Sequence, residues 1–138
     1  RKGRAGATNL TPSSTGAAKA IGKVMPHLNG KLNGQAIRVP TPNVSLVDLT
    51  VTLNKSVTAA EVIAEFKNAS TGKLKGILGV DEEYRVSSDF NGETLSTVVP
   101  IDTIQVIGGN MVKVLSWYDN EWGYSTRLVE MGIHVATK

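Results

Sequence analysis

The segment that says most about the fold of this chain is SWYDNEWGYS at residues 116–125, where we expect an apolar strand to end and a helix to begin. The run from Met111 to Trp117 is almost wholly apolar and predicts a buried strand. After the junction, Leu128, Met131 and Val135 recur at helical spacing and predict an amphipathic helix. This helix carries its apolar stripe toward the end of the chain, so it requires a surface on which to bury that stripe.

The polar turn at this junction has side chains that suit a flat aromatic amide. A carboxamide offers one acceptor and two donors, so Asn120 could bind the amide of a group such as nicotinamide, and the ring of Tyr124 could cover its face. The alternative is structural, with Asn120 or Ser125 capping the backbone N–H groups at the start of the helix. The residue types alone favour the capping role.

Other segments predict a sheet with helices on it. Hydroxyl residues at 13–15 precede an apolar periodic run that ends at Pro26, which indicates a helix. Thr58 and Glu61 have the spacing of a capping box and begin a second helix that runs to Gly72. The expected strands occupy 35–39, 46–53, 75–80, 97–101, 103–107 and 111–117, and the last helix runs from about 124 to 136. We therefore predict an α+β fold, a mostly antiparallel mixed sheet covered by helices.

Two further segments read as exposed loops. The DEE sequence at 81–83 indicates a solvated acidic turn without a partner for acid–base chemistry. The VSSDFNG sequence at 86–92 places polar groups around the ring of Phe90, which we expect to be exposed.

Two features could bind an anion. The helix that follows Thr15 offers unpaired N–H groups and the positive end of its dipole, and the Thr15 hydroxyl adds a donor. Hydroxyl residues begin most helices, so this signal alone favours an ordinary cap. Arg38 ends an expected strand before a proline-bounded loop, where its planar fork could bind phosphate. The alternative for Arg38 is an ion pair with Asp48.

Composition excludes several classes of protein. The 138 residues are 41% hydrophobic, which is typical of one globular domain, and no segment has the roughly 20 apolar residues that a bilayer requires. The basic start, RKGR, lacks the apolar core of a secretory signal. The net charge is +3, but basic residues are dispersed and aromatic residues make up 5%, so we expect no nucleic-acid partner. Without cysteine, and with His27 and His134 in structural contexts, we expect neither a catalytic residue nor a metal site.

Three motifs together resemble the phosphorylating glyceraldehyde-3-phosphate dehydrogenase family: PSSTGAAKA at 12–20, RVPTPNVS at 38–45 and the junction at 116–125. The resemblance covers essentially the whole chain and begins partway along the family's sequence. It implies that residues 1–138 form part of the catalytic domain. It also implies that the nucleotide-binding domain, the nucleophilic cysteine and the catalytic histidine lie upstream of Arg1, so we expect the chain alone to be inactive.

The resemblance further implies a reaction and a set of binding residues. The intact enzyme would convert glyceraldehyde 3-phosphate, inorganic phosphate and NAD to 1,3-bisphosphoglycerate and NADH, with NADP as the alternative cofactor. The matching residues are Thr15, Gly16, Arg38 and Arg1 for phosphate, and Asn120 and Tyr124 for nicotinamide. The family also implies a homotetramer in the cytoplasm, or in the plastid of a plant. Its C-terminal helix docks on the nucleotide-binding domain, and segment 86–92 lies near subunit contacts.

Two other functions stay open from the sequence. Erythrose-4-phosphate dehydrogenase shares the NEWG run at 120–123, but the phosphate motif and Tyr118 match the glyceraldehyde-3-phosphate enzymes better. The alternative from another class is a non-catalytic interaction fragment. That alternative gains support if the 138 residues are the whole product, because they contain no cysteine.

Overall fold

The chain folds into two compact units, with the boundary between Pro42 and Asn43. The structure is a computed structural model that describes residues 3–138, and Arg1 therefore lies outside the described residues. Within the described part of the chain, no helix has the length and apolar character needed to cross a membrane.

The first unit contains a two-stranded ladder and a short helix. Strand β1 (Thr11–Ser14) pairs antiparallel with β2 (Gln35–Arg38). Helix α1 (Ala17–Val24) and the 3-10 turn η1 (Pro26–Leu28) lie between them in sequence, so the predicted helix before Pro26 is confirmed. Strand β1 differs from the sequence prediction. Its hydroxyl residues suit a helix start as well as a strand, and only pairing with the distant β2 decides between the two.

The second unit contains a five-stranded mixed sheet built around one long strand. Its strands are β3 (Ser45–Thr52), β4 (Leu78–Asp81), β5 (Thr97–Pro100), β6 (Gln105–Ile107) and β7 (Met111–Tyr118). Strand β7 pairs with β3 along one side and with β5 and β6 on the other, all antiparallel. Only the pairing of β4 with β5 in this sheet is parallel. The predicted α+β fold, with a mostly antiparallel mixed sheet, is confirmed.

Two strands begin two or more residues later than predicted, β4 and β6, and local hydrogen bonds explain both. Residues expected to begin a strand near Thr103 instead form the 3-10 turn η3 (Ile101–Thr103), because the Thr103 hydroxyl donates to the carbonyl of Pro100 at 2.8 Å. Strand β4 begins at Leu78, since the N–H groups of Ile77 and Leu78 both bond the Leu74 carbonyl at 2.9 Å and form a turn.

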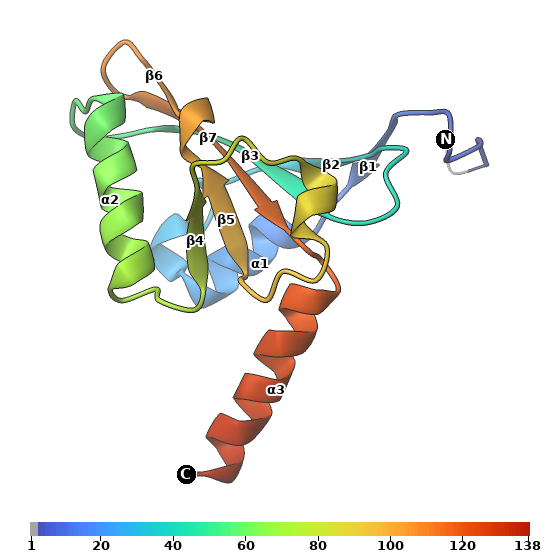
Figure 1. Cartoon of the computed structure of the whole chain (residues 1–138). Coiled ribbons are helices and arrows are strands. Elements are labelled where there is room, and N and C mark those ends of the chain that lie inside the picture. The colour runs from blue at the N-terminus through green and yellow to red at the C-terminus, as the bar shows by residue number, and fades with distance from the viewer. Residues whose placement is uncertain (1–2) are drawn as a thin grey trace. The chain divides into compact units, whose positions relative to one another are not determined.

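The main core lies between the sheet and helix α2 (Ala59–Thr71), which runs beside β4 in Figure 1. Its buried residues are Leu78, Val99, Ile104, Val112 and Val114, and Val62, Ile63 and Phe66 of α2 pack against them. The predicted capping box is confirmed. The N–H of Glu61 donates to the Thr58 hydroxyl at 3.2 Å, and the Glu61 carboxylate accepts the Thr58 N–H at 2.7 Å.

A second cluster of buried side chains lies where β3, β5 and β7 approach the 3-10 turn η2 (Ser87–Phe90). Phe90 is only 1% exposed and stacks on Trp117 with ring centroids 5.9 Å apart, so the expectation of an exposed ring was wrong. The residues next to Phe90 in the sequence are polar and suggest exposure, but the long-range contact with Trp117 buries its ring.

The acidic segment after β4 is also more ordered than expected. Asp81 is 1% exposed, and its carboxylate accepts the Arg85 guanidinium Nε–H at 2.7 Å and the Arg85 backbone N–H at 3.1 Å. The Arg85 guanidinium in turn lies 4.7 Å above the Phe90 ring. Asp81 is therefore a structural member of this corner and not part of a solvated turn.

Helix α3 (Trp122–Ala136) follows β7 directly and begins two residues earlier than expected. Figure 1 shows it extending from the end of β7. The predicted apolar stripe is present on this helix, and Leu128, Met131 and Val135 are all exposed in the described structure.

Candidate functional site

The turn between β7 and α3 is organised by Asp119, a residue that the sequence analysis did not single out. Its Oδ1 accepts the backbone N–H groups of Glu121 at 3.1 Å and Trp122 at 2.9 Å. These N–H groups open the first turn of α3 and have no partner within the helix. The structural alternative named Asn120 or Ser125 as the cap, but Asp119 performs that role. Ser125 instead donates its hydroxyl to the Glu121 carbonyl at 2.8 Å.

The second oxygen of Asp119 ties two distant segments to the same turn. Its Oδ2 accepts the backbone N–H of Gly92 at 2.9 Å and the side-chain Nδ2–H of Asn43 at 3.0 Å. Asp119 is 3% exposed, so its four hydrogen bonds replace the water that its carboxylate loses. These bonds, with the one from Trp122 contributing most, hold the pKa of Asp119 below its ordinary value against the effect of burial. Asp119 therefore stays ionised near neutral pH and fixes the backbone beside Asn120.

Asn120 itself is exposed, and among residues 3–138 its side chain has one hydrogen bond, which comes from β3. The Ser45 hydroxyl, at the first position of β3, donates to Asn120 Oδ1 at 3.1 Å. This bond uses one lone pair of the amide oxygen and leaves Nδ2, with its two N–H donors, for another partner. An amide held in this way can bind a carbonyl oxygen of a ligand.

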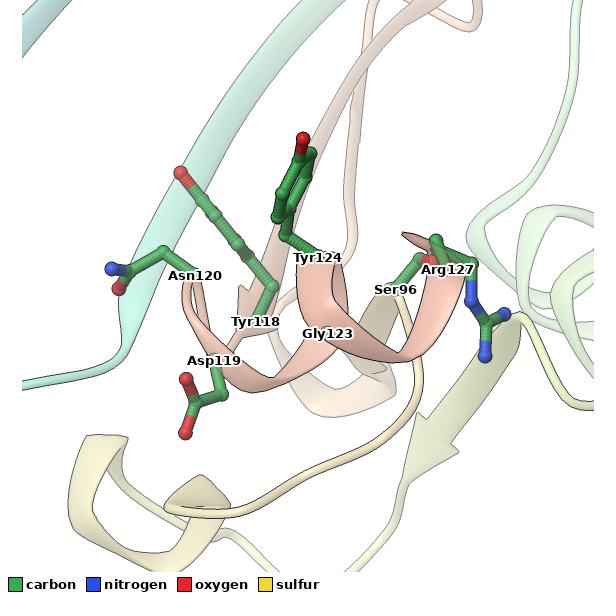
Figure 2. Close-up of a pocket in the computed structure, with 7 residues that line it drawn as sticks. All are labelled: Ser96, Tyr118, Asp119, Asn120, Gly123, Tyr124 and Arg127. Carbon is green, nitrogen blue, oxygen red and sulfur yellow. The ribbon is translucent and has the colours of Figure 1, made fainter. Parts of the chain in front are cut away.

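Asn120 and Tyr124 both line a hollow of about 290 Å³ at the start of α3 (Figure 2). Its lining residues are Ser96, Tyr118, Asp119, Asn120, Gly123, Tyr124 and Arg127. Figure 2 shows the rings of Tyr118 and Tyr124 projecting to the same side of the turn, while Asp119 projects to the opposite side. The volume is just below the range of about 300–1,000 Å³ for ligand pockets, and it has room for one aromatic ring. The structure thus brings the two residues predicted for nicotinamide to one hollow.

Two contacts fix where α3 begins relative to the sheet. A Cβ added at the buried Gly123 would lie 3.2 Å from the Leu95 carbonyl oxygen, so glycine permits a close approach of the helix to that backbone. Four residues later, the Arg127 guanidinium donates to the Gly76 carbonyl at 3.0 Å and the Thr94 carbonyl at 3.4 Å. The start of α3 is therefore fixed against the sheet, and the backbone of Tyr124 is fixed with it beside the hollow.

The residues predicted for phosphate lie in the first unit. Gly16 is the residue before α1, and the hydroxyl of Thr15 accepts the Ala17 N–H at 3.2 Å. The Thr15 oxygen thus serves as a local acceptor, and its hydroxyl donates to no acceptor among residues 3–138. Both residues are exposed, and a Cβ at Gly16 would meet nothing within 4 Å, so an anion has open access to the start of α1.

Arg38 is exposed at the other end of the β1–β2 ladder. It pairs in register with Thr11, whereas Ser14, the residue before Thr15, pairs with Gln35. Three ladder positions separate the two ends, roughly 10 Å at the usual rise per residue. The structure therefore places Arg38 and Thr15 apart along the ladder. Asp48, the alternative partner of Arg38, has its carboxylate oxygen 2.6 Å from Nζ of Lys113.

Comparison with known proteins identifies the family. Residues 1–120 match the family model described as glyceraldehyde 3-phosphate dehydrogenase, C-terminal domain. The chain is 58% identical over 138 residues to glyceraldehyde-3-phosphate dehydrogenase 1 of Bacillus cereus, a match that covers 100% of this chain and 41% of that protein. It is 55% identical over 136 residues to the cytosolic glyceraldehyde-3-phosphate dehydrogenase of Pinus sylvestris, covering 99% of this chain and 40% of that protein. The chain thus spans about two fifths of the length of these relatives.

Proposed function

Because the chain belongs to the glyceraldehyde-3-phosphate dehydrogenase family, we propose that it is the C-terminal part of a glycolytic oxidoreductase. The intact enzyme oxidises glyceraldehyde 3-phosphate with NAD and inorganic phosphate and forms 1,3-bisphosphoglycerate and NADH. Residues 1–138 supply nicotinamide positioning and phosphate recognition to that reaction. The observation that carries this proposal is the hollow at the start of α3, where an anchored amide and a phenol ring lie together.

The nicotinamide carboxamide binds at Asn120. The Asn120 Nδ2–H would donate to the carbonyl oxygen of the carboxamide, because Asn120 Oδ1 faces Ser45 and Nδ2 faces away from it. The ring of Tyr124, 68% exposed, has an apolar face free to cover one side of the nicotinamide. Together these two side chains would hold the nicotinamide ring in one rotation, and the bound cofactor would supply hydride acceptance. NAD is the proposed cofactor and NADP is the alternative.

Phosphate recognition comes from Thr15, Gly16 and Arg38, with Arg1 as a further proposed contact. The start of α1 offers N–H groups and the Thr15 hydroxyl, and Arg38 offers a bidentate guanidinium. We propose that Arg38 contacts both phosphates of the reaction, while Thr15 and Gly16 border the position of the inorganic phosphate. The reaction has two phosphates to bind, one on the substrate and one that attacks the acyl intermediate.

The chain needs the rest of the parent enzyme for chemistry. Aldehyde oxidation by this family's route begins with attack of a thiolate, and residues 1–138 contain no cysteine. We expect the isolated chain to bind ligands weakly and to form no NADH. In the parent enzyme, the exposed stripe of α3 packs on the nucleotide-binding domain, which restores its burial. The proposed assembly is a homotetramer in the cytoplasm, in keeping with the cytosolic relative from Pinus sylvestris.

The role of Asn120 is tested by replacing it with alanine in the full-length enzyme. A misplacement of about 1 Å can cost on the order of a hundredfold in rate, so Asn120→Ala should slow single-turnover hydride transfer by tenfold or more, with little change in melting temperature. Asn68→Ala, at an exposed position of α2, is the matched control and should leave the rate unchanged. Normal hydride transfer together with a sharply lowered melting temperature would show that Asn120 is only structural.

A further inference from the structure

Val44, just before β3, has a backbone conformation that a β-branched residue rarely adopts. Its φ is +67°, in the left-handed region, where the branched side chain crowds the backbone. The Val44 side chain is 7% exposed and belongs to the buried cluster with Phe90 and Val98, so the surrounding packing holds the strained conformation in place. Strain of this kind persists where the structure over-determines it and is frequent at functional sites.

The two neighbours of Val44 both bind the turn that carries the candidate site. Asn43 donates its Nδ2–H to Asp119 Oδ2 at 3.0 Å, and Ser45 donates its hydroxyl to Asn120 Oδ1 at 3.1 Å. Two consecutive residues of the turn are thus held by the two residues that flank the strained position. The contact from Asn43 fixes the backbone of the turn, and the contact from Ser45 reaches the side chain of Asn120.

The hydrogen bond from Ser45 decides which end of the Asn120 amide is available. The terminal torsion of asparagine is broad and roughly two-fold, so a free amide could present either its oxygen or its nitrogen to a ligand. In the structure Oδ1 faces the Ser45 hydroxyl, so the two N–H donors of Nδ2 lie on the other side of the amide from Ser45. The hydrogen bond to Ser45 therefore holds the amide in one of its two orientations before any cofactor binds.

We propose that Ser45 is a positioning residue for the cofactor, acting through Asn120 by fixing the orientation of its amide. This inference rests on the proposed function of Asn120. The strained backbone at Val44 holds Ser45 in register with Tyr118, at the end of β7, and so within reach of Asn120. Ser45 itself need not touch the cofactor.

The test is a double-mutant cycle in the full-length enzyme with Ser45→Ala, Asn120→Ala and the combined variant. Loss of one neutral hydrogen bond predicts that Ser45→Ala lowers kcat/KM for NAD by about three- to tenfold, with an unchanged KM for inorganic phosphate. Ser45→Thr keeps the hydroxyl and should restore the value. In the Asn120→Ala background, Ser45→Ala should have no further effect, because the amide it orients is gone.

The outcomes separate this inference from the function on which it rests. If Asn120→Ala lowers kcat/KM and Ser45→Ala does not, Ser45 has no positioning role while the function of Asn120 stands. If Ser45→Ala costs as much in the Asn120→Ala background as in the native enzyme, its effect comes from general stability of the strand, and the inference is wrong. If Asn120→Ala has no effect on kcat/KM or hydride transfer, the proposed nicotinamide site is wrong and the role of Ser45 is overturned with it.

Discussion

Replacing Asp119 with asparagine should release the turn that carries Asn120. The substitution keeps the shape of the side chain but changes one carboxylate oxygen to an NH₂ group. Each oxygen of Asp119 accepts two N–H groups. Whichever oxygen is replaced, two hydrogen bonds are lost, and the new NH₂ group points its own N–H bonds at those two N–H groups. At about 1.5–3 kcal/mol for each bond to a charged group, the loss is roughly 3–6 kcal/mol.

Hydrogen exchange measures this loss where it occurs. In the full-length enzyme, Asp119→Asn should speed exchange of the Gly92, Glu121 and Trp122 amides, and a local loss of about 3 kcal/mol corresponds to more than a hundredfold. Asp102→Asn, at an exposed position in η3, is the matched control and should change none of these amides. Unchanged protection at all three amides in Asp119→Asn would refute the view that this carboxylate holds the turn together.

The same residue predicts a dependence on pH. Hydrogen bonds from Trp122, Gly92, Glu121 and Asn43 lower the pKa of Asp119 in the folded state. A lowered folded-state pKa means that the carboxylate stabilises the fold above its unfolded pKa of about 3.9, and that this stability is lost as pH falls through the folded-state pKa. The difference in stability between the native enzyme and Asp119→Asn should therefore be constant near neutral pH and shrink below about pH 4. A difference that is the same at pH 3 and pH 7 would contradict this assignment.

Two further substitutions test the phosphate residues and the start of α3. Arg38→Lys keeps the charge but loses the bidentate guanidinium. In steady-state assays, KM for glyceraldehyde 3-phosphate and KM for inorganic phosphate should therefore both rise, each by about tenfold. Unchanged KM values would show that Arg38 has no part in phosphate recognition. Gly123→Ala places a methyl group 3.2 Å from the Leu95 carbonyl oxygen, while alanine favours the helix by up to about 1 kcal/mol. The close contact destabilises the fold and the higher helix propensity of alanine stabilises it, so the melting temperature should change little. KM for NAD should rise, because the first turn of α3 shifts. An unchanged KM for NAD would show that the helix absorbs the methyl group without moving the site.

The parts of the fold that the sequence predicts are those with local causes. The capping box at Thr58 and Glu61 is set by two residues three positions apart, and the structure confirms it. The long apolar run of β7 is likewise recognisable without its partners. Asp119 shows the opposite case. Its partners Asn43 and Gly92 lie 76 and 27 residues away in the sequence, and the residues next to Asp119 do not predict these hydrogen bonds. The one local signal was an acidic residue three positions before Trp122, a spacing typical of a helix cap.

The candidate site shows the same division between local and distant causes. Asn120 and Tyr124 stand out in the sequence because an amide and a phenol lie in one short turn. The hydroxyl that orients the amide comes from Ser45, 75 residues earlier, through pairing of β3 with β7. Phe90 illustrates the corresponding error, since its polar neighbours suggest exposure and only stacking on Trp117 buries it. Side chains that contact each other across strands are therefore the ones that sequence patterns alone do not reveal.

The most direct test of the central claim is a crystal structure of the full-length enzyme with NAD bound. The proposed function predicts that Asn120 Nδ2 lies about 2.7–3.2 Å from the carbonyl oxygen of the nicotinamide carboxamide, with Ser45 still bonded to Asn120 Oδ1 and the Tyr124 ring against the nicotinamide. A nicotinamide ring bound away from the hollow at the start of α3, or an Asn120 amide beyond hydrogen-bond distance of the carboxamide, would contradict the claim that this chain positions the cofactor.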